Sequence, residues 1–383
     1  MIWTVLQRAA RRPIRWAVAA VAGLALAACS SGPKKPQPTP LEPVVPLVEA
    51  RQVWTQSIGA VDALLVPVVR DGQLAVANAA GEVSVFDGDS GRLRWRASAG
   101  AAMAAGVGFD GRRVALVTRD SELVVLTESG VAWRQRLSAR VYTAPLVAGE
   151  RVFVLAGDRS VAAFDARTGM RLWQQPSRGT EPLVLQQPGV LTAVGNTLVA
   201  GIGGRLVGFD PDQGRVLWDG VIGRTRGATE IERLVDLVGR VGRDGDVLCA
   251  RAFQVAIGCV DAAAGRLLWT QSADGASGVQ ADGERVYGVE ANGRVIALAR
   301  RDGARLWTHE RLLHRGLSAP LAIGRSLAIG DAQGYVHLLA RADGAMLNRL
   351  ATDGSAIVEG PLAVGNTLIA VTRNGGIFAW RPQ

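Results

Sequence analysis

Seven tryptophans recur along the 383-residue chain at nearly regular intervals. The gaps between them are 41, 38, 40, 45, 51 and 38 residues. A period of about 40 to 45 residues, with four short strands in each unit, is typical of the blades of a β-propeller. We expect each indole to cover the seam between two neighbouring blades, which makes these tryptophans structural residues. The seven positions are Trp54, Trp95, Trp133, Trp173, Trp218, Trp269 and Trp307.

Most of the tryptophans end a repeated phrase, for example Phe164-Asp-Ala-Arg-Thr-Gly-Met-Arg-Leu-Trp173. An apolar strand enters a polar turn closed by glycine, which takes a positive φ without steric cost, and a second strand follows. The phrase returns at residues 339–348, where Asn348 stands in the tryptophan position. Counting Asn348, the chain has eight units. The sequence therefore predicts an all-β fold, an eight-bladed β-propeller of four-stranded antiparallel blades.

The two ends of the repeat predict how the ring closes. The last blade has a third strand at residues 376–380, but the chain stops at Gln383 before an outer strand can form. The segment from Arg51 to Gln56 is an outer strand with no blade before it. Pairing the two strands completes the last blade and removes two exposed edges. Residues 50–383 are therefore expected to form the propeller.

Residues 1–28 have the pattern of a lipoprotein signal peptide. Four arginines precede an apolar stretch at residues 16–28, which is too short to span a bilayer as a permanent helix. The sequence Leu26-Ala-Ala-Cys29 resembles a bacterial lipobox, in which cleavage leaves Cys29 as the lipidated, palmitate-carrying first residue. The alternative is an ordinary signal peptide with a chance cysteine. Because Ser30 follows instead of aspartate, the resemblance to lipoproteins implies the outer membrane.

Residues 29–49 are rich in proline and are expected to form an extended tether after the lipidated cysteine. The formal net charge of +9 includes the arginines of the signal peptide, and the remaining excess is scattered among turns. A scattered excess of this kind favours solubility, so we expect no nucleic acid partner.

Cys249 and Cys259 flank a predicted hairpin in an oxidising compartment. If the two positions face each other across the strands, they can form a disulfide. Two buried thiols are the alternative.

The chain shows no convergent set of nucleophile, base and metal ligands. We therefore predict that it is not an enzyme, has no catalytic residues and needs neither a metal nor another cofactor. The same tryptophan and turn repeat occurs in quinone-dependent dehydrogenases, which use a vicinal cysteine pair that is missing here. A periplasmic enzyme of the quinone-dependent dehydrogenase type is kept as an alternative.

The repeat is interrupted at two adjacent places, which account for the gaps of 45 and 51 residues. Residues 174–190 and 220–239 both lie between an outer strand and the inner strand of the next blade, so we expect them side by side on one face. Leu183 and Leu185 in the first insertion, with Arg233 and Asp236 in the second, have the composition of a protein-binding surface. The alternative is that the leucines fold back onto the ring's own core.

The lipobox, the tether and the eight blades resemble the BamB family of propeller lipoproteins in the outer-membrane β-barrel assembly (BAM) machinery. Two segments carry the most specific resemblance, Ala228-Thr-Glu-Ile-Glu-Arg-Leu234 and Leu312-Leu-His-Arg-Gly-Leu-Ser-Ala-Pro320. This implies a non-enzymatic scaffold at the periplasmic face of the outer membrane. It would bind the periplasmic repeat domains of BamA and other subunits of the complex and assist the insertion and folding of outer-membrane proteins.

The resemblance also implies which residues contact BamA. These are Leu183, Leu185, Gln186, Arg233, Asp236 and Val238. Gln186 and Val238 depart from the arginine and aspartate of better-known family members, which implies greater reliance on apolar contact. A client-binding chaperone that pairs extended segments with exposed blade edges is a further alternative.

Overall fold

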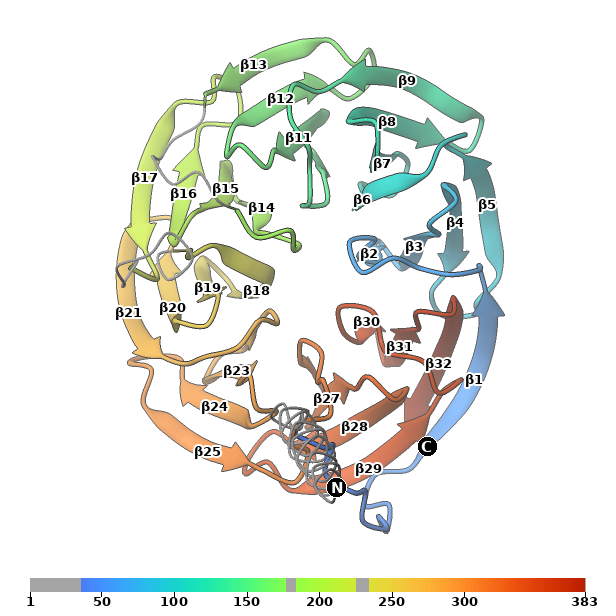
Figure 1. Cartoon of the computed structure of the whole chain (residues 1–383), viewed down its shortest axis with the longest axis vertical. Helices are drawn as coiled ribbons and strands as arrows, with labels where there is room; N and C mark the ends of the chain where they lie inside the picture. Colours follow the sequence, from blue (N-terminus) through green and yellow to red (C-terminus); the bar gives the residue numbers. More distant parts are fainter. Residues whose placement is uncertain (1–35, 177–183, 225–233, 383) are drawn as a thin grey trace, which may run out of the picture. The chain divides into compact units, whose positions relative to one another are not determined.

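The computed structural model describes residues 36–176, 184–224 and 234–382. Residues from Thr39 onward form one compact unit, in which eight four-stranded antiparallel sheets are arranged as blades around a ring (Figure 1). Within each blade the strands follow chain order from the inside outward, except in the last one. The predicted all-β, eight-bladed propeller is therefore confirmed. Among the described residues, no helix is long and apolar enough to cross a bilayer.

Blades 1 to 4 occupy the first part of the ring. Blade 1 contains β2 (Val68–Arg70), β3 (Gln73–Ala77), β4 (Glu82–Asp87) and β5 (Leu93–Ser98). Blade 2 contains β6 (Met103–Phe109), β7 (Val114–Thr118), β8 (Glu122–Thr127) and β9 (Gly130–Arg136). Blade 3 contains β10 (Leu146–Ala148), β11 (Arg151–Leu155), β12 (Val161–Asp165) and β13 (Arg171–Gln175). Blade 4 contains β14 (Leu191–Val194), β15 (Thr197–Ile202), β16 (Arg205–Phe209) and β17 (Val216–Val221).

Blades 5 to 8 complete the ring. Blade 5 contains β18 (Leu237–Asp244), β19 (Val247–Ala252), β20 (Ala256–Asp261) and β21 (Arg266–Ser272). Blade 6 contains β22 (Gln280–Ala281), β23 (Arg285–Val289), β24 (Val295–Ala299) and β25 (Arg305–His309). Blade 7 contains β26 (Leu321–Ile323), β27 (Ser326–Gly330), β28 (Tyr335–Ala340) and β29 (Met346–Ala351). Blade 8 contains β30 (Leu362–Val364), β31 (Thr367–Val371), β32 (Gly376–Pro382) and β1 (Ala50–Ser57).

The ring closes through the first and last strands. β1 pairs antiparallel with β32, with Thr55 opposite Phe378 and Gln56 opposite Ile377. The predicted closure by the segment from Arg51 to Gln56 is therefore confirmed. The hydrophobic core is divided among the seams between blades, because each blade has two apolar faces. One cluster, for example, joins Val125 of blade 2 to Val152 and Phe164 of blade 3.

Most of the repeated tryptophans pack under a glycine in the turn of the next blade. A Cβ added to that glycine would lie 2.5 to 2.8 Å from the nearest tryptophan atom, and the glycines have φ values between 65° and 77°. Only glycine meets both conditions, because any other side chain clashes with the ring and strains the backbone. The pairs are Trp54 with Gly91, Trp133 with Gly169, Trp173 with Gly214, Trp218 with Gly265, Trp269 with Gly303, and Trp307 with Gly344. In the shortened turn of blade 2, a Cβ added to Gly130 would meet nothing within 4 Å, so the pairing of tryptophan with glycine does not extend to Trp95 there.

Part of the proline-rich segment is held against blade 7. The backbone nitrogen of Thr39 donates to the carbonyl of Leu313 (3.0 Å), and that of Leu47 donates to the carbonyl of Leu347 (2.8 Å). Arginines of blade 7 and of the connection before it donate to carbonyl groups of the segment or pair with Glu42. The sequence predicts an extended tether here, and the structure adds that residues 39–48 are docked on the ring.

Candidate partner-binding surface

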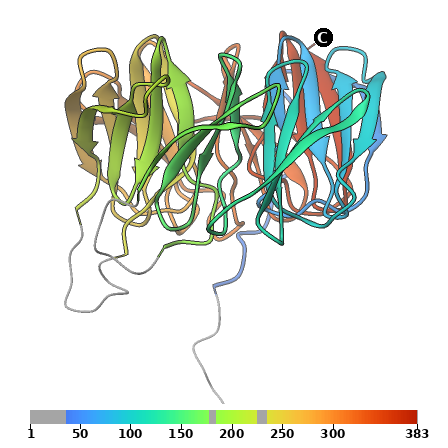
Figure 2. The ribbon, with the colours of Figure 1, turned by 90° about the horizontal axis from the view of Figure 1, so that it is seen from above.

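The two insertions emerge on one face of the ring. The connection from β13 to β14 includes the described residues 184–190, and the connection from β17 to β18 includes 222–224 and 234–236. Because both follow an outer strand, they leave the ring on the same side, which is the lower side in Figure 2. The turn between β11 and β12 of blade 3 also lies on this side, since every second strand connection of a blade returns to the same face.

Asp236 joins the two insertions to blade 3. Its Oδ2 accepts a hydrogen bond from the backbone nitrogen of Leu185 at 2.8 Å, and its Oδ1 lies 3.2 Å from Nη2 of Arg159. The side chains of Arg159 and Asp236 are only 7% and 16% exposed, so this ion pair is shielded from water. A charged hydrogen bond in such a setting is stronger than one at an open surface. The carboxylate therefore holds parts of three blade connections in one arrangement.

The backbone reinforces this junction. Gly239 donates to the carbonyl of Pro188 at 2.8 Å, Gly189 and Val238 form an antiparallel bridge, and Gly189 donates to Oγ1 of Thr143 at 3.1 Å. A small cavity of about 40 Å³ lies beneath, and Leu185, Asp236 and Val238 are among the residues that line it. These polar contacts fix the described ends of both insertions against the ring.

The predicted contact residues have different surroundings. Leu185 is half-buried, Gln186 is exposed, and Asp236 directs its carboxylate into the junction described above. Val238 belongs to β18 and is only 2% exposed, so its side chain offers almost no surface. The apolar contribution expected from Val238 at the surface does not fit this position, because the strand turns its side chain into the ring. Leu183 and Arg233 lie outside the described residues.

Arg159 is a member of the site that the sequence did not indicate. It occupies the turn between β11 and β12 with a φ of 66°, and it lies 77 residues before Asp236 in the chain. Many turns of this protein contain an arginine, so Arg159 does not stand out in the sequence. Only the packing of blade 3 against the two insertions distinguishes it.

Arg240 connects blade 5 to the segment that leads into blade 8. From β18 of blade 5 its backbone nitrogen donates to Oε1 of Glu359 at 3.2 Å, and its Nη2 donates to the carbonyl of Pro361 at 3.0 Å, both at the entry to blade 8. Burial lowers the pKa of the Arg240 guanidinium, although Glu359 opposes this effect. Blades 5 and 8 are not neighbours, so this contact links two separate parts of the inner side of the ring.

Cys249 and Cys259 face each other on β19 and β20, with their Cα atoms 4.0 Å apart, and the structure joins them by a disulfide. Both side chains are completely buried. The sequence left open a disulfide or two buried thiols, and the structure has the disulfide.

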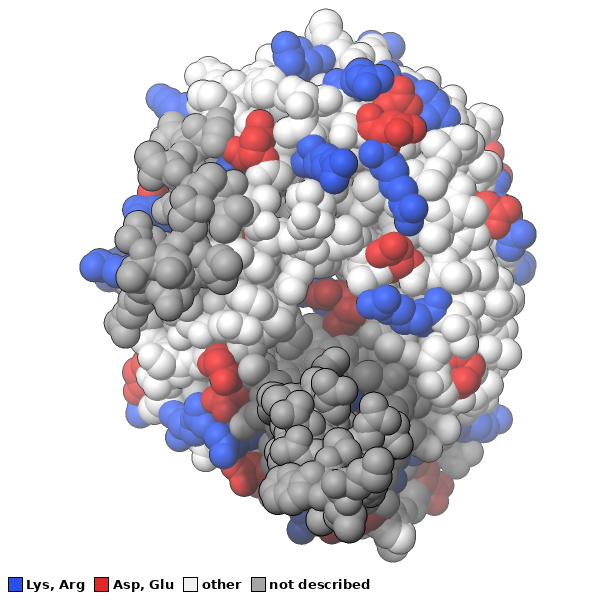
Figure 3. All heavy atoms as spheres, in the orientation of Figure 1, with Lys and Arg blue, Asp and Glu red and all other residues white. Residues whose placement is uncertain are grey.

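The described residues contain no group of three His, Cys, Asp or Glu side chains placed to hold a metal ion. On the coloured part of the face in Figure 3, basic and acidic side chains are interspersed, and no extended region of one sign is visible.

The family model and the curated relatives agree on one family. The family model described as "Outer membrane protein assembly factor BamB" matches residues 44–104 and 79–309. A protein of that name from Burkholderia pseudomallei is 36% identical over 369 residues, which is 95% of this chain and 97% of the relative. Its counterpart from Bordetella pertussis is 35% identical over 377 residues, covering 97% of each chain.

Solved structures resemble the ring as a whole. The crystal structure of BamB from Moraxella catarrhalis has a TM-score of 0.79 at 24% identity and covers 87% of this chain and 100% of its own. A europium-containing methanol dehydrogenase has a TM-score of 0.68 at 13% identity and covers 84% of each chain. At these identities both likenesses concern the fold alone.

Proposed function

This chain belongs to the BamB family of outer membrane protein assembly factors, and on that premise we propose that the surface around Leu185 and Asp236 docks the periplasmic repeat domains of BamA. It is a propeller scaffold of the BAM complex. The role that we propose is to hold BamA and other subunits in place while outer-membrane proteins are inserted and folded. Cys29 would carry the lipid that keeps the ring at the periplasmic face of the outer membrane.

The observation that carries this proposal is the junction at Asp236. One carboxylate fastens Leu185 of the first insertion and Arg159 of blade 3 to the root of the second insertion. A surface that is ordered before the partner arrives loses less conformational entropy on binding. Interruptions of a repeat that serve only as linkers do not need such a junction, so its presence supports a docking role.

The roles of the individual residues follow from their exposure. Gln186 is exposed and Leu185 is half-buried, so these two are placed to touch a partner directly. Asp236 and Arg159 act through the loops that they hold, and Val238 supports the surface from below. Leu183 and Arg233 remain proposed contact residues from the resemblance alone.

We favour a non-enzymatic role over the dehydrogenase alternative. The likeness to dehydrogenases is one of fold, and the vicinal cysteine pair of that class is missing from this chain. Function is determined by the residues of a site and not by the fold that carries it.

Crosslinking in cells tests the proposal. A photo-reactive amino acid at Gln186 is expected to capture one large outer-membrane assembly protein. The matched control is Ala263, an exposed residue in the turn between β20 and β21, on the opposite face of blade 5. It is expected to capture nothing of that size.

Two other outcomes count against the proposal. If Gln186 captures many different unfolded outer-membrane proteins and no single large one, the chaperone alternative is favoured. If Gln186 and Ala263 give the same products, the insertions do not form the docking surface.

A further inference from the structure

Residues 39–48, here called the strap, carry the chain from one face of the ring to the other. At the end of the strap, β1 begins with Ala50 opposite Pro382, so the chain enters blade 8 beside the C-terminus, on the upper side in Figure 2. At its start, Thr39 is bonded to Leu313, in the connection between β25 and β26. That connection joins an outer strand to an inner strand, as both insertions do. The strap therefore starts on the face where the insertions emerge, here called the insertion face.

A buried arginine holds the start of the strap. Nη1 of Arg315 donates to the carbonyl oxygen of Thr39 at 3.0 Å, and its Nη2 lies 2.7 Å from Oδ2 of Asp331. The side chains of Arg315 and Asp331 are only 3% and 0% exposed. Because the carboxylate fixes the guanidinium, the donor that faces the strap has a defined position. A charged hydrogen bond shielded from water in this way is stronger than one between neutral groups.

The rest of the strap is held along β29, the outer strand of blade 7. Nη2 of Arg349 donates to the carbonyl oxygen of Glu42 at 3.1 Å, and the backbone nitrogen of Leu47 donates to the carbonyl oxygen of Leu347 at 2.8 Å. Val48 packs against the core cluster that contains Leu347, whose side chain is only 8% exposed. Proline has no N–H group, so a proline-rich segment is fastened mainly through its carbonyl oxygens, and blade 7 supplies the donors.

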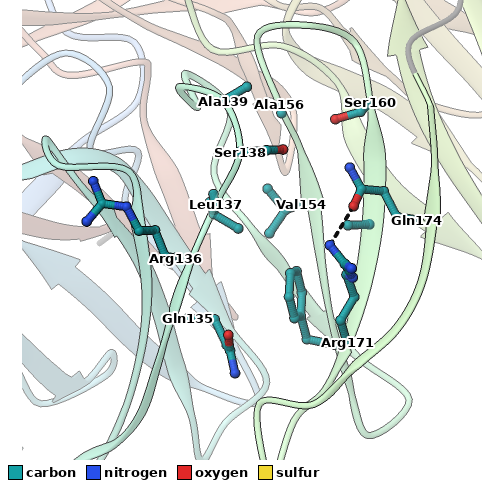
Figure 4. Close-up of a pocket in the computed structure, with 12 residues that line it drawn as sticks. Gln135, Arg136, Leu137, Ser138, Ala139, Val154, Ala156, Ser160, Arg171 and Gln174 are labelled. Atoms are coloured by element: carbon teal, nitrogen blue, oxygen red, sulfur yellow. Dashed lines mark hydrogen bonds between the residues drawn. The ribbon is translucent and has the colours of Figure 1, made fainter.

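The outer strand of blade 3 shows how these positions differ elsewhere in the ring. Leu172 occupies the position of Leu347 in its strand, but its side chain is 40% exposed. Gln174 occupies the position of Arg349, and it accepts a hydrogen bond from Arg171 of its own strand at 2.8 Å (Figure 4). The donor that reaches outside its own strand is thus a feature of blade 7, which indicates that its residues specify the docking of the strap.

We propose that the strap orients the ring at the membrane by making the lipid tether leave from the insertion face, so that this face is turned toward the bilayer. The proposal rests on the lipid at Cys29, which is part of the proposed function. Thr39 is ten residues after Cys29, a distance that an extended chain spans with at most about 35 Å. Without the strap, the first fixed residue is Ala50, 21 residues after Cys29 and on the opposite face, and the reach rises to about 70 Å.

Energy transfer to the membrane surface tests this orientation. The protein is purified from cells in detergent and reconstituted into phosphatidylethanolamine and phosphatidylglycerol vesicles that carry an acceptor dye on lipid headgroups. An azide-bearing amino acid carries the donor dye at one of two exposed positions of blade 1. Ala80 lies in the turn between β3 and β4 on the insertion face, and Ser90 lies in the turn between β4 and β5 on the opposite face. Strands of about 5 to 6 residues separate the two faces by about 17 to 20 Å, so transfer from Ala80 should be at least about twofold greater.

Deletion of residues 39–48 changes the face without changing the length of the tether. It places Glu49 ten residues after Cys29, so the tether leaves beside Ala50 on the face opposite the insertions. Transfer should then be at least about twofold greater from the opposite face than from the insertion face. The matched control inserts ten Gly and Ser residues before Thr39, which lengthens the tether and keeps the strap, and it should retain the order of the parent protein.

A second variant replaces residues 39–48 by Gly and Ser, which releases the strap but keeps β1 in place. It should abolish the difference between the two faces, and it decides the matter if the deletion variant does not fold. Equal transfer from Ala80 and Ser90 in the parent protein overturns the proposal. A released or deleted strap that leaves the parental difference unchanged overturns it as well.

Flotation with the vesicles measures the lipid anchor separately. If the protein does not float, Cys29 carries no lipid, and the chain is instead attached to a maleimide lipid through this cysteine, because Cys249 and Cys259 are bridged. The transfer from the two faces is then compared on the attached protein. BamA is absent from these vesicles, so the docking surface is tested independently by crosslinking from Gln186.

Discussion

Asn348 donates a hydrogen bond from Nδ2 to the carbonyl oxygen of Val48, at 2.8 Å. In four other blades the indole nitrogen of a tryptophan makes the corresponding bond to a carbonyl in the next blade's turn, as Trp307 does to Arg341 at 3.0 Å. Blade 8 has no such turn, because its outer strand comes from the other end of the chain. Asn348 therefore contacts the segment that leads into β1, and this accounts for the missing eighth tryptophan.

The bond from Asn348 to Val48 should contribute to the stability of the closed ring. We expect Asn348→Ala to lower the free energy of unfolding by about 1 kcal/mol, since the half-buried carbonyl of Val48 loses its donor. It should also make residues 39–48 more accessible to protease. Urea denaturation and limited proteolysis measure the two effects. The exposed Asn374→Ala serves as the control, and equal behaviour of the two variants would contradict this role for Asn348.

Closure of the ring predicts that β1 is indispensable for the fold. Deleting residues 51–56 leaves β32 as an unpaired edge, so the melting temperature should fall by about 10 °C or more. Calorimetry measures the shift. Replacing Val45, which is 82% exposed, by serine is the control and should leave the melt unchanged. An unchanged melt after the deletion would show that the ring closes in another way.

The packing of tryptophan under glycine predicts different effects of the same substitution at two turns. Gly169 and Gly195 both have a positive φ, 75° and 52°, but only Gly169 lies against an indole, that of Trp133. Alanine at Gly195 should cost about 1 kcal/mol of backbone strain. Alanine at Gly169 should cost about 2 kcal/mol more, because the added Cβ lies 2.7 Å from the ring. Chemical denaturation compares them, and equal losses would refute the packing explanation.

The stability of the ring should decrease in mild acid through His337. Burial lowers the pKa of this imidazole and outweighs the nearby Asp331, whose Oδ2 lies 3.0 Å from Nε2. The unfolded chain accepts a proton near pH 6.5, whereas the folded ring resists it. The contribution of the neutral His337 side chain to stability is therefore present at pH 7, and it is lost as the pH falls below about 6.5.

Melting curves between pH 7 and pH 5 test this prediction. His337→Gln removes the titrating group and keeps an amide that can donate to Asp331, so the decrease in melting temperature over this range should become smaller. His314→Gln changes an exposed histidine and should leave the decrease as it is. If both variants follow the parent curve, His337 is not responsible for the acid sensitivity.

The facing positions of Cys249 and Cys259 predict that neither thiol is free. Thiol titration of the denatured, unreduced protein should find no reactive group from this pair. The bridge closes a loop with a sequence separation of 10, so its reduction should lower the free energy of unfolding by about 2 to 3 kcal/mol. Melting of the double variant Cys249→Ser and Cys259→Ser, with and without reductant, is the control. Two free thiols in the parent protein would rule out the bridge.

Much of the fold could be predicted because a propeller repeats its local signals. Each turn glycine and each tryptophan is close in the chain to the strands that it joins, so spacing alone indicates blades, their number and the closing strand. The missing tryptophan at Asn348 was visible in the sequence as well. Its reason was not, because the partner of Asn348 is Val48, which lies 300 residues away in the chain.

The candidate site could be located only in part. The long gaps indicated where the insertions are and that they share a face, and the resemblance supplied Leu185 and Asp236. The sequence did not reveal that Asp236 is engaged by Arg159 or that Val238 turns inward. Each of these depends on how one blade packs against the next.

The sequence by itself therefore determined the ring, because a strand, a turn glycine and a seam tryptophan are specified within one repeat. Only the tertiary structure decided which side chains are free to meet a partner. That outcome depends on contacts such as the one from Arg159 to Asp236. Such contacts join residues of different blades, and their strength comes from burial and geometry that no spacing along the chain records.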